Sequence, residues 1–228
     1  MPTVAPLPRG SRAGVDEDVH ALQQQWEQIK YRKAAADQAK AYETLAATAA
    51  GVRARHADRA EPEIWYGIIV ASYAGAKGGL GALGLAKDAK AALEHALTLD
   101  PKALQGSAYT SLGSLYYQVP GWPIGFGNDA KARELLDQAL ALNPDGIDPN
   151  YFLGDFLYRQ RDYEGARRAL EAELREAIAS DAAVQTAHLL APEMLRDTCL
   201  QQASDMATEA SRVLTLHKLR RDFTQAGV

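Results

Sequence analysis

The sequence predicts an all-α fold of stacked helical hairpins, because the same spacing of small and apolar residues recurs along the chain. In the middle of the chain, Gly113 lies within one apolar helical pattern, and Ala132 lies within a second pattern that ends before Pro144. The equivalent residues are Gly67, Ala89 and Pro101 upstream, and Gly154 and Ala166 downstream. Ala132 and Ala166 are 34 positions apart, and each proline lies 12 positions after its alanine. A repeated helix-turn-helix unit explains this agreement.

The spacing is that of a tetratricopeptide repeat, in which a helix A is followed by a helix B. Tyr109, Leu112, Gly113 and Tyr116 occupy the W-x2-L-G-x2-Y positions of helix A, with Tyr in place of Trp. A small residue on each helix lets the two helices approach closely, while larger residues at helical spacing fill the seam between them. The three predicted repeats cover residues 61–101, 106–144 and 148–180.

The two ends of the chain are expected to cap this short solenoid, because terminal repeats are usually atypical. Residues 1–15 contain prolines and glycines but no apolar run, so they suggest a flexible leader rather than a signal peptide. Residues 16–60 form an N-terminal helical pair in this scheme, with Asp16 at its start. Residues 190–225 form a last amphipathic helix that carries Cys199 on its apolar face, and residues 16–228 together form a single helical repeat domain.

Composition narrows the class of protein. A chain of 228 residues with 47% hydrophobic and 24% charged residues can bury one continuous core. The formal net charge of -4 gives no reason to expect a nucleic-acid partner, since a phosphate-binding domain normally shows a basic patch or a high pI. The single cysteine excludes an internal disulfide and leaves the cellular compartment open.

The first repeat contains an insertion between its two helices. Gly67 and Ala89 are 22 positions apart, about 10 more than the repeat requires. Residues 79–84 match the dinucleotide-binding pattern G-x-G-x-x-G, and Asp100 follows at a suitable distance. We reject that interpretation because the glycines do not directly follow a predicted strand and no strand-helix alternation continues downstream. They are instead predicted to form an inserted loop.

The second repeat contains a more unusual insertion. Gly113 and Ala132 are 19 positions apart, about 7 more than expected. The extra segment places Trp122, Ile124 and Phe126 among prolines and glycines, whereas an ordinary hairpin loop is short and polar. These side chains could fold back on the core as a lid, line a pocket, or form an exposed adhesive patch.

The sequence shows no arrangement of residues that would support catalysis. The five histidines are scattered, and there is no H-E-x-x-H, G-x-S-x-G or Walker motif. We therefore expect no catalytic residues, no metal and no cofactor, and the protein is expected not to be an enzyme. In the turn at residues 143–150, Asp148 is a more plausible helix N-cap than a calcium ligand, because the spacing lacks the glycine and glutamate of an EF-hand.

The repeat geometry predicts where a ligand would bind. The helix A positions that line the inner groove carry tyrosines, aliphatic residues and one carboxylate, not the Lys and Arg that would clamp an acidic peptide. This composition suits a small apolar or amphipathic ligand. The candidate ligand-binding residues, from the groove and the insertions, are Ile68, Tyr73, Leu83, Tyr116, Tyr117, Trp122, Ile124, Phe126, Tyr151, Asp155 and Tyr158.

Two stretches also carry a family resemblance. The run YTSLGSLYYQVPGWPIGFGNDAKARELLDQALALNPDGIDPNYFLGDFL, together with IWYGIIVASYAGAKGGLGALGLAKDAKAALEHAL upstream, resembles the TatT-type accessory component of TRAP transporters over residues 61–173. The resemblance implies a non-catalytic, all-helical protein of the cell envelope. It also implies association with a periplasmic solute-binding protein, and passage of ligand through a pocket or pore. The resemblance extends to related repeat proteins that serve lipid or sterol transport, so it also implies such transport as an option for this chain.

Two functions are therefore in competition. The first is a periplasmic transport accessory that binds or hands over a lipid, a sterol-like molecule or an organic acid with a periplasmic solute-binding or transport protein. The second is a scaffold that holds a partner peptide or helix in its groove. Whether the chain forms a homo-oligomer is left open, and a cytoplasmic location is an alternative to the envelope.

Overall fold

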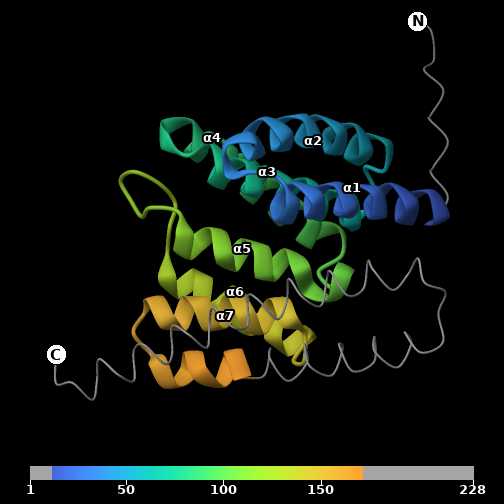
Figure 1. Ribbon diagram of the computed structural model, residues 1–228. Helices are drawn as coiled ribbons and strands as arrows, with labels where there is room; N and C mark the ends of the chain where they lie inside the picture. The colour runs from blue at the N-terminus through green and yellow to red at the C-terminus, as the bar shows by residue number, and fades with distance from the viewer. Residues whose placement is uncertain (1–11, 172–228) are drawn as a thin grey trace, which may run out of the picture.

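The computed structural model describes residues 12–171, which are helical apart from their connections (Figure 1). The helices are α1 (Arg12–Arg32), α2 (Ala35–Arg55), α3 (Ala60–Lys77), α4 (Gly79–Leu99), the 3₁₀ turn η1 (Ala103–Gly106), α5 (Ser107–Gln118), α6 (Asp129–Leu142) and α7 (Ile147–Arg159). Residues 163–171 are again helical. Within the described range the only strand-like feature is a bridge between Gly121 and Gly127. The all-α, tetratricopeptide-like fold predicted from the sequence is confirmed.

Each repeat glycine lies against a leucine of the following helix. A Cβ added to Gly67 would lie 2.6 Å from Leu93 Cγ, and a Cβ added to Gly154 would lie 2.7 Å from Leu170 Cγ. The central repeat shows the same arrangement between Gly113 and Leu136. These close approaches are the reason that the predicted glycine and alanine spacing recurs.

The core runs through the stack as three adjoining clusters. The first joins α1, α2 and α3, the second joins α3, α4, α5 and Leu135 of α6, and the third joins α6, α7 and residues 163–171. The A helices α3, α5 and α7 lie side by side in Figure 1, as in a short solenoid. No helix in residues 12–171 is both long enough and apolar enough to span a bilayer.

The first insertion differs from its prediction. Residues 79–84 do not form a loop, because they make up the first turns of α4, and α3 continues as far as Lys77. The insertion therefore lengthens both helices of the hairpin. The reversal is made at Gly78 and Gly79, whose φ angles of 62° and 63° suit glycine. Residues 68–70 are helical, so no strand precedes the glycines as a dinucleotide site would require.

Helix boundaries differ from the sequence prediction at several places. Helix α1 begins at Arg12, before Asp16, and the N-cap of α7 is Gly146, with Asp148 in the first turn. Helix α6 has a side-chain cap, because Asn128 Oδ1 accepts a hydrogen bond of 3.0 Å from the backbone N–H of Lys131. The predicted helix at 190–225, Cys199 and the end of the repeat at 148–180 lie outside the described residues.

Candidate functional site

Residues 119–128 form the α5–α6 loop, whose backbone closes on itself. The N–H of Gly127 donates to Pro120 O at 3.0 Å, and the N–H of Asn128 donates to Tyr116 O at 2.8 Å. Inside the loop, two successive N–H groups donate to Gly121 O, each at 3.1 Å. A Cβ on Gly127 would collide with the carbonyl oxygen of Val119, so this crossing requires glycine. The loop therefore has a defined shape, which includes a cis peptide bond before Pro123.

The base of the α5–α6 loop packs on the neighbouring helices. The ring of Phe126 meets the ring of Tyr116 edge to face, with centroids 5.5 Å apart. Lys90 Nζ lies 5.8 Å from the Phe126 centroid, and Leu83 of α4 lies beside Gly125. Three predicted site residues, Leu83, Tyr116 and Phe126, thus come together as packing beneath the loop.

The tip of the α5–α6 loop carries Trp122 and Ile124, and it projects away from the helices. In Figure 1 the loop projects at the left end of the molecule. The Trp122 side chain is 90% exposed and Ile124 is 69% exposed. The sequence left three roles open for this insertion: a lid on the core, the lining of a pocket, or an exposed patch. Trp122 and Ile124 form an exposed patch, whereas Phe126 is folded back onto its neighbours.

Two predicted groove residues, Tyr117 of α5 and Asp155 of α7, interact with each other. Tyr117 donates to Asp155 Oδ2 at 2.8 Å, and Arg159 Nε donates to the same oxygen at 3.1 Å. Burial, and after it the negative charge of Asp155, raises the pKa of Tyr117 well above its usual range. The hydroxyl therefore stays protonated as a donor. The rings of Tyr151 and Tyr158 pack on Phe152 and Tyr163, with centroids 5.3 Å and 5.9 Å apart.

The remaining predicted site residues lie in the core between other helices. Tyr73 is 8% exposed, donates to Glu43 Oε1 at 3.3 Å and packs in the cluster of α1, α2 and α3. Ile68 is half-buried against the cluster of α3, α4 and α5. The eleven predicted residues therefore belong to separate places: the loop and its base, the Tyr117–Asp155 contact between α5 and α7, the rings of Tyr151 and Tyr158 on α7, and the core around α3.

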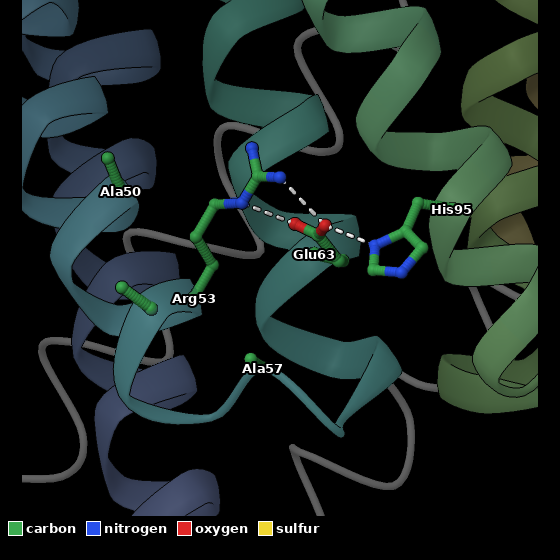
Figure 2. A pocket seen from close by; sticks show the side chains of 6 residues that line it. Ala50, Arg53, Ala57, Glu63 and His95 are labelled. Atoms are coloured by element: carbon green, nitrogen blue, oxygen red, sulfur yellow. Dashed lines mark hydrogen bonds and ion pairs between the residues drawn. The ribbon is translucent and has the colours of Figure 1, made fainter. Parts of the chain in front are cut away.

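A cavity of about 380 Å³ lies elsewhere, where α2, α3 and α4 meet (Figure 2). We call it the Glu63 cavity. It is lined by Ala50, Arg53, Ala54, Ala57, Glu63 and His95. None of these residues is among those predicted from the sequence, although one signal is present there: Glu63 is a carboxylate next to the apolar run that begins at Ile64.

Glu63 is the centre of an ionic cluster in this cavity. Its side chain is 5% exposed, and Arg53 reaches it with Nε 2.6 Å from Oε2 and with Nη2 2.8 Å from Oε1. His95 Nδ1 lies 2.6 Å from Oε1. An ionised carboxylate can only accept, so Nδ1 of His95 carries a proton. Nε2 is then an acceptor in the neutral ring and a donor in the imidazolium. Figure 2 shows Nε2 on the side of the ring away from Glu63.

The guanidinium of Arg53 also makes a cation–π contact with an aromatic ring. Its guanidinium lies 4.3 Å from the ring centroid of Tyr66, whose hydroxyl donates to Asp88 Oδ2 at 2.8 Å. Burial raises the pKa of Tyr66, and the hydrogen bond to Asp88 adds to the effect. The cluster therefore links α3, which carries Glu63, to α2 through Arg53 and to α4 through His95. Within residues 12–171, no group of three or more His, Cys, Asp or Glu side chains is placed to hold a metal ion.

The comparison with protein families agrees with the fold. Residues 125–189 match the family model of the tetratricopeptide repeat. No curated protein matches the chain. A solved structure from the functional characterization of pilF of Pseudomonas aeruginosa is similar at 15% identity and a TM-score of 0.35, and the alignment covers 92% of this chain and 99% of that one. The match to the repeat model and the glycine-leucine hairpins support the same conclusion: the described part of the chain is a stack of tetratricopeptide-like helical repeats.

Proposed function

We propose that the protein is a non-catalytic scaffold that binds a protein partner through the tip of the α5–α6 loop. The observation that carries this proposal is the 90% exposure of Trp122 on a loop whose backbone is closed by hydrogen bonds. An exposed Trp next to an exposed Ile leaves apolar surface in water, and such surface often marks an interaction site.

Physical chemistry favours this tip as a binding element. Trp is enriched among the residues that dominate interface energetics, where truncation to Ala commonly costs about 2 kcal/mol or more. A loop already held in shape loses less conformational freedom on binding than a flexible one. By contrast, two of the predicted groove residues already use their polar groups on each other, because the Tyr117 hydroxyl donates to Asp155 Oδ2 at 2.8 Å.

The test is affinity capture with the full chain and with two variants. Trp122→Ala is expected to lose captured partners, since it removes the exposed anchor without touching the core. Leu104→Ala is the matched control, because Leu104 is also an exposed apolar residue, at 40%. Circular dichroism checks that all three proteins are equally helical. Retention of the same partners by Trp122→Ala would reject the loop tip as the binding element.

A second candidate is the transport accessory that the resemblance implies: a protein of the periplasm or cell envelope that hands a small apolar or amphipathic ligand to a solute-binding or transport protein. The Glu63 cavity favours it, because about 380 Å³ falls within the range of roughly 300–1,000 Å³ for small-molecule sites. Native mass spectrometry with organic extraction separates the two candidates. A stoichiometric lipid, sterol or organic acid would support the carrier, and an unliganded mass after incubation with such compounds would count against it.

A further inference from the structure

We infer that the α5–α6 loop tip of one copy of this chain binds in the Glu63 cavity of a second copy. This inference rests on the proposed function, since it uses the same tip, and it names the partner. The observations that carry it are the exposed apolar tip of the loop and an open cavity on the same molecule, which is lined by small apolar side chains and by the polar groups of Arg53, Glu63 and His95.

The cavity offers an apolar surface to a flat ring. Ala50 and Ala54 lie one turn apart on α2, Ala57 follows the end of that helix, and all three line the cavity from exposed positions. Residues four apart on a helix are neighbours on its surface, so these small side chains form a low wall that a larger side chain can cover. Trp122 is the large exposed side chain that would cover it.

The polar groups match as well. The Trp122 indole N–H can only donate, and a buried Trp usually finds an acceptor for it. In the neutral ring of His95 whose Nδ1 donates to Glu63 Oε1, 2.6 Å away, Nε2 carries no proton and can accept this hydrogen bond. The Arg53 guanidinium at the same site adds a cation, which the face of an indole attracts.

The α5–α6 loop tip and the Glu63 cavity lie near opposite ends of helix α3. Helix α3 begins beside the cavity with Glu63 in its first turns and ends at Lys77, which lies beside Gly81 of α4, close to the loop contact made by Leu83. In Figure 1 the loop projects at the left, while α2 ends and α3 begins at the right. Association is therefore head to tail: each copy inserts its own tip and receives another. A contact built on one loop is small, so the association is weak and depends on concentration.

Sedimentation velocity and native mass spectrometry on the full chain over a concentration series test this. Wild type is expected to form dimers and larger species as concentration rises. Trp122→Ala removes the exposed ring of the tip, and Ala54→Arg fills the cavity from an exposed helical position, so each is expected to weaken association at least about tenfold. Ala47→Arg, at an exposed position of α2 outside the cavity, is the control for Ala54→Arg and is expected to associate like wild type. Trp122→Phe keeps the ring and loses the N–H, so it is expected to weaken association about two- to tenfold.

Mixing the two blocked variants gives the sharpest result. Trp122→Ala retains an intact cavity and Ala54→Arg retains an intact tip, so an equimolar mixture is expected to form a one-to-one dimer and nothing larger. A wild-type chain that stays monomeric throughout the series overturns the inference, as does self-association that Ala54→Arg leaves unchanged. If the chain stays monomeric while Trp122 is needed to capture a different protein, this inference fails and the proposed function stands. If neither occurs, both fail.

Discussion

Gly113 lies directly against Leu136: a Cβ added to the glycine would lie 2.7 Å from Leu136 Cγ and 3.4 Å from the carbonyl oxygen of Ala132. The same relationship joins Gly67 to Leu93 and Gly154 to Leu170. The distance between the two helices of each hairpin is therefore set by the absence of one methyl group.

Gly113→Ala is expected to lower the free energy of unfolding by about 1–3 kcal/mol, because the added methyl overpacks the seam against Leu136. Gly75→Ala is the control. Gly75 lies inside α3, and a Cβ added there would have no neighbouring atom within 4 Å, so this change is expected to raise stability by about 0.5–1 kcal/mol through helix propensity. Urea denaturation measures both, and equal effects of the two substitutions would contradict the packing argument.

Glu63→Gln is expected to lower the free energy of unfolding by about 1–3 kcal/mol, since it weakens charge-assisted hydrogen bonds to Arg53 and His95 at a site where the carboxylate is buried. Glu134→Gln breaks an exposed pair with Lys131 and is expected to cost less than about 1 kcal/mol. The difference in the denaturation midpoint tests this, and similar losses in the two variants would show that burial of Glu63 adds nothing.

Trp122→Ala is expected to change the free energy of unfolding by less than about 0.5 kcal/mol, because the side chain is 90% exposed. Phe126→Ala is expected to cost about 1–3 kcal/mol, because the same loop packs this ring on Tyr116 and on the core. Thermal unfolding of the pair distinguishes an exposed tip from a buried lid. A large loss of stability in Trp122→Ala would mean that the ring is covered in solution.

Asp18→Asn tests a link between α1 and the end of α2. The hydrogen bond from His56, 2.9 Å away, and a second one from Arg55 hold the pKa of Asp18 below its ordinary value of 3.8. A lowered folded-state pKa stabilises the fold above the ordinary pKa and ceases to do so as the pH falls through the folded value. Wild type is therefore expected to be more stable than Asp18→Asn near neutral pH, and this advantage should shrink as the pH falls below about 4.

Urea titrations of the two proteins at several pH values measure that difference. Asp145→Asn, a change at an exposed turn residue, is the control and is expected to show no comparable pH-dependent loss. An advantage of wild type over Asp18→Asn that persists unchanged at acidic pH would contradict the role of the ionised carboxylate.

The repeat could be predicted from the sequence alone. Glycine and alanine at fixed positions on a helical pattern, with a period of 34 residues between Ala132 and Ala166, are sufficient to predict hairpins of closely packed helices. This information is local, because which residues share one face of a helix follows from their separation along the chain.

The surroundings of each side chain depend on the tertiary structure. Trp122 and Phe126 are apolar residues of one loop, yet one projects into solvent and the other packs on Tyr116, since only the second lies above a neighbouring helix. Glu63, Arg53 and His95 come from three helices, so no spacing pattern in the sequence predicts that they form a cluster. Helical periodicity belongs to a single segment, whereas exposure and ion pairing depend on which other segments come to lie beside it.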